Sequence, residues 1–297
     1  MTGAAPEPVL TVTLNPAIDL ELQAPRLRRG AIARACGSSR RAGGKGINVA
    51  RALSQMGVGA AAAVALGGVE GRLFVELLGR PGFALHPIAI AGGVRTNVTI
   101  ARPGEGYLYK INQPGPEISA RETERILGAI ETLARGRKWV VLSGSLPPGM
   151  PDEVYARLAR AAHKREANVA IDCEGEALLG ALGEKPDLVK INRRELGATL
   201  GRPLRGRAAV IAGMRELRRK GAGLIVITNG PRPSLALDER GGLTLAKPPR
   251  ALKERVFGAG DFMLAALLAG LLAGKPFADS FAEATARATE AFHASAT

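Results

Sequence analysis

The sequence predicts an α/β fold in which a mostly parallel central sheet carries helices on both faces. First, from about residue 119 onward, short apolar segments that suit strands alternate with longer segments of helical periodicity. Second, segments such as 60–66 and 224–228 are strongly apolar, which is typical of strands covered on both sides. Third, three short segments between residues 84 and 111, separated by Gly-rich turns, indicate a small antiparallel patch beside this sheet.

The first third of the chain supplies the elements before and within that patch. Residues 9–14 alternate Val and Thr and end at an Asn-Pro turn, so they predict a strand. A polar, Arg-rich stretch runs to residue 41, and the glycine turn 43–46 then opens a helix that ends near Gly57. The following elements are a buried strand at 60–66, a helix at 70–79, and three short strands at 84–90, 94–101 and 106–111.

The remaining two thirds of the chain show the strand and helix alternation. Ser119 and Glu122 form a capping-box pattern that opens a helix to about residue 135. Later strands are expected at 139–142, 169–172, 188–191 and 224–228, a hairpin at 234–246, and helices at 151–165, 206–220, up to 274, and 277–293. Because no repeat or low-complexity linker divides the chain, residues 1–297 predict one α/β domain with a small β insertion.

Composition excludes several classes of protein. The chain has 297 residues, 41 Lys+Arg and 27 Asp+Glu, a net charge of +14, but its basic residues are scattered and only 4% of residues are aromatic. This distribution argues against a nucleic-acid partner. The longest apolar runs are too short to span a bilayer, and two distant cysteines indicate neither a disulfide framework nor a zinc site. With no secretion pattern at the N-terminus, we expect a cytoplasmic protein without a membrane partner.

The segment Gly258-Ala259-Gly260-Asp261 is the first candidate for chemistry. Small residues ahead of a helix leave its first backbone N–H groups unobstructed, and these groups together with the helix dipole favour an anion such as phosphate. Asp261 is then either a helix cap or a general base beside the anion. A base next to a phosphate site indicates phosphoryl transfer.

The glycine turn Gly43-Gly44-Lys45-Gly46 is the second candidate. It lacks the spacing of a nucleotide P-loop. Two residues without side chains either give a flexible entry to the helix or let the backbone approach a polyhydroxylated ligand, with Lys45 and Asn48 adding charge and hydrogen bonds. Asp19, which follows an Asn-Pro turn, is either a loop cap or a carboxylate that binds vicinal hydroxyls.

Together these motifs resemble the ribokinase-like (PfkB) carbohydrate kinases, and within them the branch of 1-phosphofructokinase and tagatose-6-phosphate kinase. The resemblance covers nearly the whole chain in the family's order. It rests on six segments: Thr13 to Asp19, Gly43 to Arg51, Arg95 to Asn97, Ser143 to Gly149, Lys190 to Glu195 and Gly258 to Asp261.

The resemblance implies a role for each matching position. Asp261 would be the base that deprotonates the acceptor hydroxyl. Within the segment from Gly258 to Asp261, the backbone N–H groups of Ala259, Gly260 and Asp261 would form the anion hole. The sugar hydroxyls would bind to Asp19, Gly43, Gly44 and Asn48, and the phosphate already on the substrate to Lys45, Arg95 and Lys110. Asn192 and Glu195 would order Mg²⁺ through water beside the ATP phosphates, and Thr228 and Gly230 would approach the nucleotide.

The resemblance also implies a lid, formed by inserted segments at about 15–42 and 84–112, which covers the sugar and in relatives often supports a homodimer. The expected substrates are ATP and a ketohexose monophosphate. Fructose 1-phosphate, giving fructose 1,6-bisphosphate, comes first, and tagatose 6-phosphate or fructose 6-phosphate are alternatives. Phe262, Ala266, Pro233, Ile191 and the tail from residue 284 depart from the family pattern. They leave open a catalytically weak regulator of the same fold that binds sugar phosphate.

Overall fold

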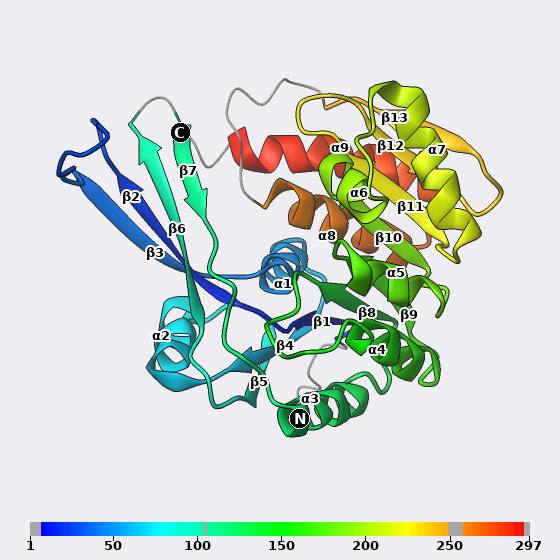
Figure 1. The fold of residues 1–297 in the computed structure, drawn as a ribbon. Helices are drawn as coiled ribbons and strands as arrows, with labels where there is room; N and C mark the ends of the chain where they lie inside the picture. The colour runs from blue at the N-terminus through cyan, green and yellow to red at the C-terminus, as the bar shows by residue number, and fades with distance from the viewer. Residues whose placement is uncertain (1–6, 104–105, 249–257, 294–297) are drawn as a thin grey trace.

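The large sheet of the computed structural model has nine strands in the order β13-β12-β11-β10-β9-β8-β1-β4-β5 (Figure 1). The structure describes residues 7–103, 106–248 and 258–293. Neighbouring strands from β5 to β11 are parallel, and β12 and β13 add an antiparallel edge. The strands are β1 (Val9–Thr13), β4 (Ala60–Leu66), β5 (Ala84–Ala89), β8 (Trp139–Ser143), β9 (Asn168–Asp172), β10 (Leu188–Asn192), β11 (Leu224–Thr228), β12 (Ser234–Leu237) and β13 (Leu243–Ala246).

Helices cover both faces of this sheet, which confirms the predicted fold class (Figure 1). Alternate strand residues divide between two apolar cores: Leu10 belongs to one and Val9 to the other. The first core receives α3 (Ala120–Leu133), α4 (Val154–His163), α5 (Glu176–Leu182), α6 (Arg193–Thr199) and α7 (Gly206–Arg219). The second receives α1 (Lys45–Gln55), α2 (Gly68–Leu78), α8 (Ala259–Leu272) and α9 (Phe277–His293).

A second, four-stranded sheet extends away from the large one (Figure 1). Its strands are β3 (Gly37–Gly43), β2 (Ala17–Gln23), β6 (Arg95–Arg102) and β7 (Gly106–Ile111), in that order across the sheet. β2 is antiparallel to β3 but parallel to β6, and β6 is antiparallel to β7. The sheet is therefore mixed rather than purely antiparallel.

Two sequence-based expectations for this region need correction. Residues 84–90 were expected in the antiparallel patch, but β5 pairs in parallel with β4 at the edge of the large sheet. The polar stretch before residue 41 was not assigned strands, yet it supplies β2 and β3, which pair with each other residue for residue. These polar strands become stable only by pairing with partners distant in the chain, so local periodicity does not reveal them.

Helix α8 packs into the second apolar core and carries the candidate base in its first turn. Its sequence is apolar on every side except at the first turn, and it contacts α1, α9 and β10. Burial of Asp261 and of residues 263–268, together with the contacts to α1 and β10, holds the first turn of α8, which carries the candidate base, near the end of β10.

Candidate active site

The parallel strands bring polar side chains together at one edge of the large sheet. Thr13 at the end of β1 lies beside Ser143 on β8, and Ser143 lies beside Asp172 on β9. In the same way Asn192 on β10 lies beside Thr228 on β11. Ligands of open α/β sheets bind outside the carboxyl ends of the strands, so this edge is the expected place for a site. In the described part of the chain, the buried hydroxyls of Thr13 and Ser143 have no hydrogen-bond partner.

Asp261 lies in the first turn of α8 and faces this edge. The helix begins after Gly258, whose φ of 87° is left-handed, and no side chain among the described residues caps it. The first intrahelical hydrogen bond within it runs from Phe262 N to Gly258 O at 2.9 Å, so the N–H groups of Ala259, Gly260 and Asp261 precede the helical ladder. The Asp261 carboxylate accepts a hydrogen bond from Asn48 Nδ2 at 2.8 Å rather than capping the helix.

The surroundings of Asp261 suit a proton acceptor at neutral pH. Its side chain is only 7% exposed, and burial raises the pKa of Asp261 to about 6. The neighbouring Asp172 carboxylate also raises this pKa, whereas Lys190, the Asn48 hydrogen bond and Lys45 lower it. A carboxylate with a pKa near 6 is ionised at pH 7 and still basic enough to take a proton from an alcohol as it reacts.

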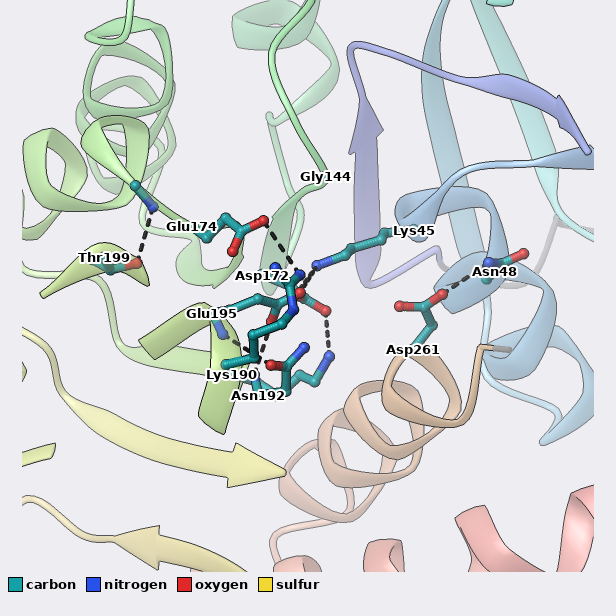
Figure 2. Close-up of polar contacts among 12 residues, drawn as sticks. Lys45, Asn48, Gly144, Asp172, Glu174, Lys190, Asn192, Glu195, Thr199 and Asp261 are labelled. Carbon is teal, nitrogen blue, oxygen red and sulfur yellow. Dashed lines mark hydrogen bonds and ion pairs between the residues drawn. The ribbon is translucent and has the colours of Figure 1, made fainter. Parts of the chain in front are cut away.

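Lys45 reaches from the start of α1 into a network of buried charges (Figure 2). Its Nζ lies 2.8 Å from Asp172 Oδ1 and 3.2 Å from Glu195 Oε1, and Lys190 Nζ lies 2.5 Å from Asp172 Oδ2. Burial alone lowers the pKa of Lys45, but the two carboxylates outweigh it and raise that pKa well above its ordinary value. Burial likewise opposes ionisation of Asp172, but Lys190 and Lys45 hold the pKa of its carboxyl below the ordinary range.

Lys45, which was predicted to bind the phosphate already on the substrate, extends toward other charged side chains. Its ammonium points away from the small sheet and toward Asp172 and Glu195 (Figure 2). Lys190 approaches the anion hole directly, since a Cβ on Gly260 would lie 2.8 Å from Lys190 Nζ. Two ammonium groups therefore adjoin the first turn of α8.

The glycine turn has a steric reason for its composition. A Cβ on Gly43 would lie 2.1 Å from Asp19 Oδ2, and Gly44, which precedes α1, has a φ of 133° that L side chains rarely adopt. The turn thus seats the Asp19 carboxylate against bare backbone. Asp19 also accepts a hydrogen bond from Asn97 Nδ2 at 3.1 Å, across the β2 and β6 register.

The predicted sugar-binding residues of the small sheet share one face. Asp19 pairs with Asn97, Arg95 lies two residues before Asn97, and Lys110 pairs with Thr99, two residues after it. Because side chains alternate along a strand, Asp19, Arg95, Asn97 and Lys110 project from the same side. The opposite side packs Ile18 and Ala42 into the second apolar core, together with Phe74 of α2.

Arg95 is tied to the backbone at the base of the small sheet. Its Nη1 donates to Gln113 O at 2.8 Å and its Nη2 donates to Asn15 O at 3.1 Å, while its buried Nε has no partner in the described structure. Burial lowers the pKa of the Arg95 guanidinium. The guanidinium therefore holds two loops in place with two of its five N–H donors. Lys110 is exposed on the edge strand β7.

The predicted nucleotide-side residues adjoin the same edge. Asn192 and Glu195 form a reciprocal capping box at the start of α6: Glu195 N donates to Asn192 Oδ1 at 2.9 Å, and Asn192 N donates to Glu195 Oε2 at 2.8 Å. Gly230, with a φ of 59°, follows β11. Beside it Pro233 and Arg232 line a pocket that reaches toward α7.

The positions that depart from the family pattern are accommodated within the described structure. The Phe262 ring is half-buried and packs against the second apolar core, while Ala266 is buried in it. Ile191 is fully buried in the first core. In the tail, Ala284 and Ala288 pack on the second core as part of α9, and residues 294–297 lie outside the described residues.

Two members of the charge network, Asp172 and Lys190, were not among the predicted site residues. Asp172 was placed at the end of an expected strand and Lys190 inside another, and neither was given a role, although both are at most 4% exposed. A charged residue within or at the end of an apolar strand segment was the available signal, since such residues are rarely buried without a partner. Asn97, the partner of Asp19, was part of a recognised motif without an assigned role.

Comparison with known proteins places the chain in a family. The sequence profile of the pfkB family carbohydrate kinases matches residues 12–296. The 1-phosphofructokinase of Rhodobacter capsulatus is 38% identical over 262 residues, which cover 88% of this chain and 82% of the relative. The ATP-dependent 6-phosphofructokinase isozyme 2 of Escherichia coli (strain K12) is 31% identical over 261 residues, 87% of this chain and 84% of the relative.

A solved structure agrees with this placement. The tetrameric inhibited form of phosphofructokinase-2 from Escherichia coli superposes with a TM-score of 0.88 at 29% identity, covering 95% of this chain and 93% of that chain. Among the described helices, none is long and apolar enough to cross a membrane. The fold, the ordered motifs and the match across nearly all of the sequence lead to one conclusion: this chain belongs to the PfkB family of carbohydrate kinases, enzymes that use ATP to phosphorylate a hydroxyl group.

Proposed function

We propose that this protein is a cytoplasmic kinase that transfers the γ-phosphoryl group of ATP to a hydroxyl of a ketohexose monophosphate, with fructose 1-phosphate as the preferred substrate. The observation that carries this proposal is the position of Asp261. Its carboxylate is buried beside three backbone N–H groups that precede the helical ladder of α8. This arrangement supports the assignment of a base beside an anion hole, the pair of groups that transfer of a phosphoryl group to an alcohol requires.

In the proposed reaction, Asp261 takes the proton of the acceptor hydroxyl as the oxygen attacks the γ-phosphorus and the bond to the ADP oxygen breaks. The N–H groups of Ala259, Gly260 and Asp261 stabilise charge on the moving group. Lys45 and Lys190 add positive charge next to that position. Buried charges act strongly here because little water screens them.

The small sheet supplies the proposed sugar contacts. Asp19, seated against Gly43, offers a carboxylate for vicinal hydroxyls, together with Gly44 and Asn48. Arg95 and Lys110 lie on the same face and are the proposed partners of the phosphate already on the sugar. We assign this sheet as a lid made mainly of β2, β3, β6 and β7, which excludes water from the reacting groups.

Magnesium fits the nucleotide side through water rather than by direct ligation. Both oxygens of Glu195 are already hydrogen-bonded or ion-paired, to Asn192 N and Lys45 Nζ, and Asn192 Oδ1 receives Glu195 N. Within the described residues no group of three or more acidic, His or Cys side chains is arranged to hold a metal. Mg²⁺ commonly retains several waters and binds substrate phosphates, whose charge it neutralises. Glu195 and Asn192 would orient its waters, and Thr228 and Gly230 would contact the nucleotide.

The preference for fructose 1-phosphate is supported by the name of the relative at 38% identity, a 1-phosphofructokinase. The relative at 31% identity is a 6-phosphofructokinase, which makes fructose 6-phosphate the second candidate substrate. Tagatose 6-phosphate remains an alternative from the sequence motifs. ADP formation with a panel of hexose monophosphates tests the proposal: highest kcat/KM with fructose 1-phosphate is expected, and highest kcat/KM with a 6-phosphate would reassign the substrate.

A regulator that binds sugar phosphate without catalysis is distinguished by thermal shift. The kinase is expected to be stabilised by ATP with Mg²⁺ and by fructose 1-phosphate when each is added separately. Stabilisation by the sugar phosphate alone, together with no ADP formation, would support the regulator.

We further propose that the small sheet supports a homodimer. Two large apolar side chains on its edge strand β7 are exposed, Tyr109 by 60% and Ile111 by 56%. Exposed apolar residues on a sheet edge favour pairing with another chain. Light scattering should give twice the mass of the chain, and a Tyr109→Glu, Ile111→Glu variant should give the monomer mass. A wild-type monomer at micromolar concentration would refute this assembly.

A further inference from the structure

Arg51, which was given no role by the sequence motifs, connects the candidate base to the small sheet. It lies one helical turn after Asn48 on α1, and its Nη1 donates to Asn48 Oδ1 at 3.2 Å. Its Nη2 donates to Ala42 O, in β3, at 3.1 Å. Asn48 in turn donates from Nδ2 to Asp261 Oδ2 at 2.8 Å. A continuous chain of hydrogen bonds therefore runs from β3 through α1 to the first turn of α8.

The donors and acceptors in this series of hydrogen bonds fix the orientation of the Asn48 amide. A guanidinium group has only donors, and an ionised carboxylate has only acceptors. An amide placed between them satisfies both in one orientation alone, with its oxygen toward Arg51 and its nitrogen toward Asp261. When Asp261 has taken a proton it no longer holds the amide nitrogen as firmly, so Arg51 is then the group that keeps the amide in place.

We propose that Arg51 is a positioning residue of the kinase reaction, which holds the Asn48 amide in the orientation that supports the Asp261 carboxylate as the base. This inference rests on the proposed role of Asp261. Arg51 itself touches no reacting atom. Its effect is to keep the hydrogen bond from Asn48 aligned in every turnover and thereby to favour the ionised carboxylate.

The shape of the guanidinium explains why arginine is suited to this position. Two different nitrogens of one planar group reach Asn48 and Ala42 from a single half-buried side chain. A lysine ammonium at the same position keeps the charge but lacks the rigid fork that spans both acceptors. We therefore expect Arg51→Lys to retain more function than Arg51→Met, which keeps the apolar stem and removes every donor.

The charged groups around Arg51 and Asp261, at the two ends of the hydrogen-bond chain, remain in place in the variants proposed below. Lys190, Asp172 and Lys45 face Asp261. Arg41 and Asp19 face Arg51, and burial together with Arg41 lowers the pKa of its guanidinium. A change in the pH profile on substitution of Arg51 can thus be assigned to the Asn48 link when Asn48→Ala produces the same change.

The test is a double-mutant cycle on the full chain with Arg51→Met, Asn48→Ala and the double variant, and with Arg51→Lys as the conservative substitution. Arg72→Met, an exposed arginine on α2, serves as the control. We expect Arg51→Met to lower kcat about 10-fold, within the ~10² that small misplacements cause. Its KM for ATP should not change, the acid limb of its kcat profile should move to higher pH, and Arg72→Met should match wild type.

Non-additivity decides the outcome. If Arg51 acts through Asn48, the double variant should be no slower than the slower single variant, and both singles should show the same shift of the acid limb. Fold-losses in kcat that multiply, or an unshifted acid limb in Arg51→Met, would overturn the inference. Circular dichroism and thermal melting identify a variant that fails to fold, in which case Arg51→Lys, with an intermediate shift of the acid limb, carries the test. Asp261→Asn tests the base independently: if that variant keeps wild-type turnover, the proposed function fails, whatever Arg51 does.

Discussion

Replacement of Asp261 by Asn tests both the chemistry and the electrostatics of the site. The substitution keeps the shape of the side chain but removes the proton acceptor. A general base contributes about 10²–10⁴-fold to the rate, so kcat for ADP formation should fall by at least ~10²-fold while the affinity for the sugar phosphate is kept. Turnover close to that of the wild type would remove Asp261 from its proposed role.

The same variant has a calculable effect on stability. The pKa of Asp261 is raised from its ordinary value of 3.8 to about 6. Between these values the native protein binds more protons than the unfolded chain, so the stability of the wild type falls as pH rises through this window. The full destabilisation, present above pH 6, is about 3 kcal/mol. About 1.4 kcal/mol of it develops between pH 5 and pH 8.

Urea denaturation at pH 5 and pH 8 measures this effect. The Asn variant lacks the buried charge and should not lose this stability. The free energy of unfolding of the variant minus that of the wild type should therefore increase by about 1.4 kcal/mol from pH 5 to pH 8. Asp152→Asn, at an exposed position before α4, is the matched control and should show no such change. A stability difference that is independent of pH, or that shrinks toward pH 8, would refute the account of a destabilised buried carboxylate.

Three further substitutions probe other parts of the site. Gly43→Ala places a Cβ 2.1 Å from Asp19 Oδ2 and must displace that carboxylate. Initial-rate kinetics should show that KM for the sugar rises about 10-fold, the effect of ~1.4 kcal/mol of lost binding, while KM for ATP is unchanged. Equal changes in both KM values would contradict the sugar assignment. Arg95→Ala should raise KM for the phosphorylated sugar more than KM for ATP, and an unchanged sugar KM would assign the sugar's phosphate elsewhere. Lys190→Met leaves the fully buried Asp172 with one ammonium partner instead of two, and should lower the free energy of unfolding by about 3 kcal/mol. Adding Asp172→Asn should recover part of this loss in urea denaturation, and no recovery would show that the pair is not the cause.

Part of the site could be predicted because its signals are local. The sequence around Gly258 and Asp261 combines small residues, an acidic residue and an apolar helix, and in the structure Asp261 lies in the first turn of that helix, before its first intrahelical hydrogen bond. The capping box at Ser119 likewise forms as predicted, with Glu122 N donating to Ser119 Oγ at 3.3 Å. Such patterns involve residues within one turn of a helix.

The partners of Lys45 could not be predicted in the same way. The lysine lies 127 positions from Asp172 and 150 from Glu195, and no local rule connects residues so far apart. Its place in a motif predicted a contact with the sugar's phosphate, whereas the direction of its side chain depends on how α1 packs against β1, β8 and α8. For the same reason Asp172 and Lys190 received no role from the sequence.

The amino-acid sequence by itself determined the alternation of strands and helices, the parallel sheet and the motifs that carry the family resemblance, because hydrophobic periodicity, caps and turns act between neighbouring residues. Tertiary structure alone decided that β5 joins the large sheet, that polar segments pair as β2 and β3, and that Asn48 meets Asp261 from 213 positions away. These contacts arise when packing closes long loops, and their free energy comes from burial and pairing that no short segment contains.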